Sequence, residues 1–303
     1  MTNNDWDPLK EIIVGSATGA RLPVNCPKFR ELEKTTGWTE TPVPSGNFPQ
    51  HVIDEANEDL ENLSDTLKSL GVLVHRPKDL DFASFDGMYN YCPRDRVLIL
   101  GNNIIDAPMT FPTRKPEIKA IEEYLKGPRY VCHDEEVFFD AANVCRLGKD
   151  LIYLVSDSGN VEGGLWLSVM FPEYKVYTLE NAYGGVHIDS TIVPVREGLV
   201  VLNADRINHK NLPEPFWYWD KIWISKKEIK EKSFYKYPYA SNYIGLNFLS
   251  VNPNLVICDP EQTYLREQLN RFGVETIGVD LRHSRTLGGG HHCVTLDLVR
   301  QHG

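Results

Sequence analysis

Short apolar runs recur along the chain, and each is rich in β-branched residues and bounded by turn residues, as β-strands are. A second apolar run and a tight turn precede most of them, which predicts β-hairpins. The clearest runs lie at residues 12–14, 97–100, 151–155, 199–202 and 255–258. The hairpin partners expected before three of them are residues 142–147, 190–195 and 243–251.

Helices are expected after these hairpins, because apolar residues then recur in steps of three and four. The longest such stripe covers residues 53–70 and ends at Gly71. A helix capped by Asp259 should run to Gly273, and residues 118–125 repeat the pattern. Short returning strands are expected at residues 72–75, 130–132 and 274–279.

The unit of strand, turn, strand, helix and strand thus recurs about five times. Five like units closing in a ring would form one α/β domain, residues 1–303, around a central axis. A pair of unrelated α/β domains is the alternative, but neither a linker nor a low-complexity tract divides the chain. We therefore predict a single domain.

Composition narrows the range of partners. The formal net charge of −10 disfavours nucleic acid, which needs a basic face, and suits a cationic small molecule. No apolar run is long enough to cross a bilayer, so we expect no membrane contact. The 6 cysteines form no CxxC pair, and the polar start carries no signal-peptide pattern. These features favour a cytoplasmic protein with free thiols.

Residues whose side chains can act as nucleophiles, acids, bases or ligands cluster just before the first strand of each hairpin. Asp140, His187 with Asp189, and Ser241 hold this place, and Cys293 starts the last predicted strand, residues 292–298. In a ring of like units, equivalent positions fall at one end of the axis. These side chains should therefore converge on one pocket.

Cys293 follows three glycines, whose backbone can approach a ligand closely and whose amides can stabilise a thiolate. The other cysteines are expected to be small buried side chains. A zinc site at His291, His292 and Cys293 is disfavoured, because adjacent strand residues point to opposite faces and no further ligand lies at zinc spacing. We expect no metal and no other cofactor.

The remaining polar candidates each have two interpretations. His187 is either a hydrogen-bonded loop residue or a general acid and base, and Asp189 would face the same side of an extended segment. Asp140 is flanked by apolar residues and needs a cationic partner from the protein or from a ligand. Asp95, by local pattern alone, is a turn residue before a strand.

Together the motifs resemble the arginine:glycine amidinotransferase family of the pentein superfamily. The matching stretches are Trp6-Asp-Pro-Leu9, Ile12-Ile-Val-Gly15, Pro93-Arg-Asp95 with Gly101-Asn102, Ala107-Pro-Met109, Phe139-Asp-Ala-Ala142, His187-Ile-Asp-Ser-Thr191, Asp205-Arg206, and Leu287-Gly-Gly-Gly290 with His292-Cys293. They follow the family's order through the chain. The resemblance implies a five-bladed α/β propeller of ββαβ modules, which agrees with the repeat.

The resemblance also implies roles for these residues. Cys293 would be the nucleophile that carries the amidino group of L-arginine. His187 would be the general acid and base, with Asp140 as its carboxylate partner. Asp95 and Asp189 would bind the guanidinium group of the donor.

Further positions would hold the rest of the substrate. Arg206 and Ser241 would hold the amino-acid end of the donor, and His292 would also border the substrate. Gly184 stands where glycine-using members carry an asparagine, which implies room for a different or larger acceptor. Members of the family amidinate lysine, aminocyclitols and toxin precursors. Asn143 replaces the last residue of the family's FDAAD motif, with no assigned consequence.

The reaction implied by the resemblance releases ornithine and passes the amidino group to an amine acceptor, with ping-pong kinetics. Hydrolysis to citrulline by the same apparatus is the nearest alternative, although the motif context favours transfer. A non-catalytic binding protein is disfavoured, because Cys293, His187 and Asp140 are all present. A thiol protease is disfavoured by the paired carboxylates. A homodimer would fit families of this kind.

Overall fold

The computed structural model describes residues 1–35 and 45–301, and their strands form five three-stranded sheets and one two-stranded ribbon. In each three-stranded sheet the first two strands are antiparallel and the third runs parallel to the second. Sheet by sheet, the strands are β17 (Thr295–Arg300), β1 (Leu9–Val14) and β4 (Leu73–His75); β5 (Val97–Leu100), β6 (Asn103–Asp106) and β7 (Arg129–Val131); β8 (Val144–Leu147), β9 (Asp150–Leu154) and β10 (Lys175–Leu179); β11 (Ile192–Arg196), β12 (Leu199–Asn203) and β13 (Asp220–Ile224); β14 (Leu249–Asn252), β15 (Leu255–Cys258) and β16 (Glu275–Gly278). The ribbon pairs β2 (Arg21–Leu22) with β3 (Gly46–Asn47).

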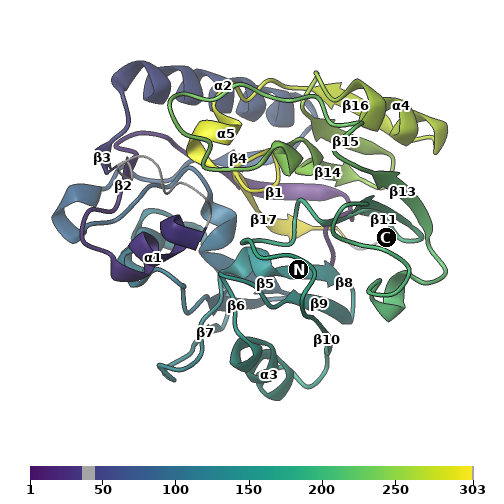
Figure 1. Ribbon diagram of the computed structural model, residues 1–303, viewed down its shortest axis with the longest axis horizontal. Helices are drawn as coiled ribbons and strands as arrows, with labels where there is room; N and C mark the ends of the chain where they lie inside the picture. Colours follow the sequence, from purple (N-terminus) through teal and green to yellow (C-terminus); the bar gives the residue numbers. More distant parts are fainter. Residues whose placement is uncertain (36–44, 302–303) are drawn as a thin grey trace.

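The ring closes where the last strand, β17, pairs with the first, β1. In Figure 1 the strands β17, β5, β8, β11 and β14 surround the centre, and the longer helices lie at the periphery. The α-helices are α1 (Pro27–Thr35), α2 (Gln50–Ser69), α3 (Val161–Met170), α4 (Thr263–Arg271) and α5 (Ser284–Leu287). This architecture confirms the five-bladed α/β propeller. No helix of the described part of the chain is long and apolar enough to span a bilayer.

Burial explains why the sequence showed the strands so clearly. The central strand β12 is buried at every residue, and β9 at all but its first. Strands covered on both faces are continuous apolar runs, not alternating ones. The outer strand β10, in contrast, has a single buried residue, Leu179.

One helix prediction was wrong, and another helix is present but starts later than predicted. Residues 118–125 lie in 3₁₀ segments, Pro112–Ala120 and Glu122–Tyr124, because Pro116 sits inside the turn and has no amide hydrogen to donate. The helix near the C-terminus starts at Thr263, so Asp259 does not cap it. The Asp259 carboxylate instead accepts from the Glu261 amide at 3.1 Å and pairs with Lys232.

Two strands begin later than predicted, and both differences concern the site. Residues Asn242–Leu246 form a 3₁₀ turn before β14. Gly245 packs there against Gln262, where a Cβ would lie 2.7 Å from the Gln262 side chain. Strand β17 begins at Thr295, so His292 and Cys293 lie in the turn before it.

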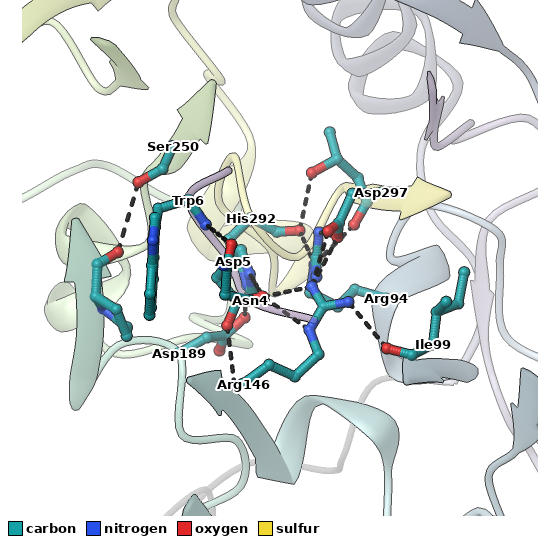
Figure 2. A network of polar contacts seen from close by, with 12 residues as sticks. Asn4, Asp5, Trp6, Arg94, Ile99, Arg146, Asp189, Ser250, His292 and Asp297 are labelled. Carbon is teal, nitrogen blue, oxygen red and sulfur yellow. Dashed lines mark hydrogen bonds and ion pairs between the residues drawn. The ribbon is translucent and has the colours of Figure 1, made fainter. Parts of the chain in front are cut away.

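A buried ion-pair network fills the axis of the propeller. Asp297 on β17 is 0% exposed and receives Arg94 at 2.6 Å, Arg146 at 2.8 Å and Arg300 at 2.8 Å. Asp5 binds the same Arg146, as Figure 2 shows. Burial alone would raise the pKa of Asp297, but the three guanidiniums hold that pKa well below its usual value.

The N-terminal segment closes one end of the axis. The Thr2 amide donates to the Gly101 carbonyl, and the Gly148 amide donates to the Asn3 carbonyl, both at 2.9 Å. Gly101 and Gly148 lie in the hairpin turns that follow β5 and β8. The opposite end of the axis, where the inner strands begin, is the end at which a site can form.

Replacing Asp297 tests how far the fold depends on this network. Asp297→Asn keeps the shape but leaves three buried guanidiniums without their shared anion, so we expect a loss of about 3–5 kcal/mol in the free energy of unfolding, measured by urea denaturation. Glu267→Gln is the control, because it removes an exposed ion pair to Arg271 and should cost less than about 0.5 kcal/mol. Equal losses for the two variants would contradict a central role for Asp297.

Candidate active site

The candidate site gathers residues that stand just before the inner strands. Asp95 ends a 3₁₀ turn before β5, Asp140 precedes the turn before β8, and Asp189 precedes β11. Asn247 and Cys293 precede β14 and β17 in the same way. The structure thus brings residues from five blades to one end of the axis, as the repeat predicted.

Cys293 is held in a tight turn and is 3% exposed. Its thiol donates to Asp189 Oδ2 at 3.2 Å, and its amide donates to Asn247 Oδ1 at 3.0 Å. The glycines before it leave room for a second thiol, because a Cβ on Gly289 would lie 2.4 Å from Cys92 Sγ. The Gly tract is therefore a packing requirement of the site.

The surroundings of Cys293 favour the neutral thiol. The Cys92 thiol, burial and the Asp189 carboxylate all raise the pKa of Cys293 well above its usual value, against an opposing contact with His187. Burial likewise raises the pKa of Cys92. A cation placed against Cys293 would shift this balance towards the thiolate.

His187 stands between two carboxylates, with its side chain 14% exposed. Nε2 lies 3.0 Å from Asp140 Oδ2, and Nδ1 lies 3.6 Å from Asp95 Oδ1. The Thr110 amide donates to the other Asp140 oxygen at 3.1 Å and so fixes its orientation. Burial would lower the pKa of His187, but Asp95 and Asp140 outweigh it and raise that pKa well above its usual value. The two carboxylates therefore favour the protonated imidazole.

One carboxylate oxygen of Asp95 accepts a hydrogen bond from Arg114, whereas the other lies near His187 without a hydrogen bond to any described residue. Arg114 Nη1 donates to Oδ2 at 3.0 Å, and Arg114 Nε pairs with buried Glu117. Within the described part of the chain, Asp95 Oδ1 is buried and has no hydrogen-bond partner. Burial raises the pKa of Asp95, with His187 and Arg114 opposing. An acceptor of this kind fits a cationic N–H donor from a ligand.

Asp189 links the cysteine turn to the axis network. His292 Nδ1 lies 2.8 Å from Asp189 Oδ2, and His292 Nε2 lies 3.9 Å from Asp5 Oδ1. Burial would raise the pKa of Asp189, but His292 lowers it to about 2. His292 and Cys293 therefore share one partner, which strand alternation was expected to prevent. Both ring nitrogens of His292 face protein carboxylates, so its contact with substrate remains a prediction.

Metal binding has no support in the geometry of this cluster. Over residues 1–35 and 45–301 no group of three or more His, Cys, Asp or Glu side chains is arranged to hold a metal ion. All 6 cysteines are free, and Cys145 and Cys258 lie in the core as predicted. Cys132, however, is only partly buried.

Arg206 forms a second cationic feature beside the cluster. Its Nη1 donates to Thr191 Oγ1 at 2.8 Å, and its Nη2 lies 3.5 Å from Ser241 Oγ. The guanidinium carbon lies 3.8 Å from the ring centroid of Tyr183 and 4.7 Å from that of Tyr243. The predicted pair Arg206 and Ser241 is therefore in contact.

Gly184 lies on the loop that carries His187 and is exposed, with nothing within 4 Å of a Cβ built on it. It touches none of the charged residues of the site. The space around it is compatible with a larger acceptor, which remains a prediction.

Sequence reasoning missed four residues that the structure places in or beside the site: Cys92, Arg114, Tyr183 and Asn247. Asn247 had a usable signal, because it stands just before β14, where the other blades carry polar site residues. Cys92 was assigned to the core, and it is 2% exposed, but it also lies beside Cys293. Arg114 and Tyr183 belong to no local sequence pattern. Arg114 binds Asp95, which is 19 residues away along the chain. Tyr183 reaches its partners only because its loop folds back on itself.

The arrangement combines a buried thiol, a protonated imidazole and three carboxylates within one polar cluster. Such a cluster suits a cationic substrate with a planar, multi-donor group, because carboxylates bind guanidinium groups through paired hydrogen bonds. The thiol and imidazole supply a nucleophile and a proton donor at the same place.

Comparisons with known proteins agree with this chemistry. No protein-family model matches the chain. The chain is 38% identical to inosamine-phosphate amidinotransferase 1 of Streptomyces griseus, over 98% of this chain and 96% of the relative. It is 30% identical to L-arginine:L-lysine amidinotransferase of Pseudomonas savastanoi pv. phaseolicola, over 98% and 93%.

A solved structure extends the likeness to the fold. The structure of an inosamine-phosphate amidinotransferase from Streptomyces griseus superimposes with a TM-score of 0.92 at 38% identity, covering 100% of this chain and 97% of that one. Identity at this level over whole chains, with the same fold, is shared by members of one enzyme family. The chain therefore belongs to the amidinotransferase family.

Proposed function

We propose that this amidinotransferase takes the amidino group of L-arginine, holds it on Cys293 and delivers it to the amine of a small acceptor. The observation that carries the proposal is the cluster of Cys293, His187 and the carboxylates of Asp95, Asp140 and Asp189. Arg206 and Ser241 bind the carboxylate of the amino-acid donor in this proposal. The absence of a hydrogen-bond partner on Asp95 Oδ1 among the described residues supports a ligand there.

In the first half-reaction, the guanidinium lies against Asp95 and Asp189 with its central carbon facing Cys293. Its positive charge lowers the pKa of the thiol, and the thiolate attacks the carbon. The carbon–nitrogen bond to the ornithine portion breaks. His187 gives its proton to the departing amine, which would otherwise be a poor leaving group. Ornithine leaves with its side-chain amine as an ammonium group, which has taken up the proton of the thiol as well as that of His187, and a cationic amidino thioether remains on Cys293.

In the second half-reaction, His187 is neutral and can accept a proton from the incoming ammonium group. The amine then attacks the amidino carbon, and the carbon–sulfur bond breaks as the second proton of the attacking nitrogen passes to the sulfur, which restores the Cys293 thiol. His187 ends protonated, as it began. Asp140 holds the imidazole throughout, since its own second oxygen is fixed by the Thr110 amide.

For the acceptor, we propose an inosamine phosphate or a closely similar aminocyclitol phosphate. The relative at 38% identity is named for inosamine phosphate, whereas the one named for lysine is 30% identical. The open space around Gly184 is compatible with an acceptor larger than glycine.

The test of this function starts with arginine alone. We expect a mass gain of one amidino group on the Cys293 peptide, with stoichiometric ornithine, and no gain in Cys293→Ala. Adding inosamine phosphate, lysine or glycine should then discharge the adduct, with inosamine phosphate fastest. Citrulline formed over many turnovers would show that water is the acceptor, and the absence of both adduct and ornithine would refute the arginine donor.

Replacing Asp140 should change how the reaction depends on pH. Asp140 helps to raise the pKa of His187, so Asp140→Asn lowers that pKa and the proton is lost at lower pH. Because His187 donates this proton, the rate of Cys293 amidination should fall by about 100-fold at about pH 8 and by less near about pH 6. Single-turnover rates across this range measure it. A loss of the same size at every pH would contradict the proton-donor role of His187.

Replacing Cys92 should make Cys293 easier to ionise. Cys92 is the largest cause of the raised pKa of Cys293, so Cys92→Ala should move the midpoint of Cys293 alkylation by iodoacetamide to lower pH. Peptide mass spectrometry separates Cys293 from the other cysteines, and Cys258→Ala is the control, because Cys258 lies in the core away from the site. An unchanged midpoint in Cys92→Ala would show that the two thiols do not interact.

A further inference from the structure

Tyr183 contacts two parts of the site that have different proposed tasks. Its ring lies flat against Arg206, with the guanidinium carbon 3.8 Å from the ring centroid. Its hydroxyl donates to the Val186 carbonyl at 2.8 Å and also to the carbonyl of His187. One side chain thus joins the cation to the main chain of the histidine.

The loop that carries Tyr183 is shaped for these contacts. The ring folds back over Gly185, where a Cβ would lie 2.2 Å from the ring, so no larger residue fits there. The Gly185 carbonyl accepts from the Asp157 amide at 3.0 Å, which anchors the loop to the neighbouring blade. Burial raises the pKa of Tyr183 to about 12, so its hydroxyl keeps its proton and remains a donor.

Arg206 is held in a complementary way. Thr191 and Ser190 accept from its Nη1 at 2.8 Å and 3.3 Å, so the edge of the guanidinium is fixed while Tyr183 covers its face. The ring of Tyr243 also lies near Arg206, with the guanidinium carbon 4.7 Å from its centroid, but the Tyr243 hydroxyl donates to Asp205 at 2.6 Å and not to the main chain of His187. Of the two rings beside Arg206, Tyr183 is therefore the one that also reaches His187.

We propose that Tyr183 is a positioning residue that couples the grip on the donor's carboxylate to the placement of His187. This inference rests on the proposed function, in which Arg206 holds that carboxylate and His187 transfers the proton. A carboxylate drawn onto Arg206 presses the guanidinium and ring together, and the hydroxyl on the same ring holds the His187 carbonyl. Recognition of the amino-acid end of the donor is in this way linked to the proton transfer.

The test measures single-turnover amidination of Cys293 over a range of arginine concentrations, which gives a plateau rate and a half-saturation concentration. Tyr183→Phe removes only the hydroxyl, so the plateau should fall about tenfold with little change in half-saturation. Tyr183→Leu also removes the ring, so half-saturation should rise in addition by about 3- to 30-fold. Tyr243→Leu should raise half-saturation but lower the plateau less than Tyr183→Leu does.

The pH profile separates positioning from loss of packing. If Tyr183→Phe loosens the pairing of His187 with Asp140, the pKa of His187 falls, and the alkaline decline of the plateau rate moves to lower pH. Tyr174→Phe is the matched control, because it removes a remote tyrosine hydroxyl that donates to Asn3 at 3.2 Å. Its plateau, half-saturation and pH profile should equal those of the unaltered protein.

The outcomes distinguish this inference from the function on which it rests. A Tyr183→Phe plateau and pH profile equal to those of Tyr174→Phe would overturn the coupling while arginine turnover stands. A Tyr183→Leu variant that changes half-saturation alone would also overturn it, because the ring would then serve only to bind. If the unaltered protein forms no adduct from arginine, the proposed function fails first, and the coupling fails with it.

Discussion

The site depends on a single buried anion, Asp297, and the arginines that surround it. Arg94, Arg146 and Arg300 come from three separate segments of the ring, and Arg146 also holds Asp5 from the N-terminal segment. Removing so many charges from water is costly, so such a network adds little net stability unless every member is paired. The effect of the network is to fix the positions of these chain segments relative to one another. Arg94 Nε also donates to the His292 carbonyl at 2.8 Å, so the network directly holds the turn that carries Cys293.

The balance of charge around Cys293 is the opposite of that in the network around Asp297. The three arginines of the axis outnumber its two carboxylates, Asp297 and Asp5, whereas the cluster around Cys293 has carboxylates in excess of its cationic partners. The Cys92 thiol, burial and the Asp189 carboxylate raise the pKa of Cys293 and favour the protonated thiol, and Asp95 and Asp140, against the effect of burial, raise the pKa of His187 and favour the charged imidazole. A guanidinium ligand brings the missing positive charge and reverses the first of these preferences. In the proposed mechanism the substrate thus activates the nucleophile that attacks it, and the thiol stays protonated and unreactive towards other reagents until the substrate binds.

The sequence predicted the parts of this structure that follow from local patterns. Buried strands and the α2 stripe were visible because their burial is continuous or periodic. Segments shaped by proline or by distant packing were not, as the 3₁₀ turns around Pro116 and Gly245 show. In the site, Asp140, Asp189 and Cys293 were found because the repeat gives them equivalent positions before the inner strands, whereas Asp95 was assigned by the family resemblance alone and Asn247 was missed. Arg114 escaped detection because its role comes from contacts with Asp95 and Glu117 that only the folded chain creates.

The same electrostatics bear on why an amine, rather than water, would accept the amidino group. In the proposed mechanism His187 is neutral after the first half-reaction, and its raised pKa favours uptake of a proton. An alkylammonium group has a pKa of about 10, whereas water has one of about 16, so the ammonium yields its proton far more readily. Water must also reach the adduct, and Cys293 is only 3% exposed. An ammonium acceptor is drawn to the surrounding carboxylates, while neutral water gains nothing from them. The charge that binds the donor therefore also selects the class of acceptor.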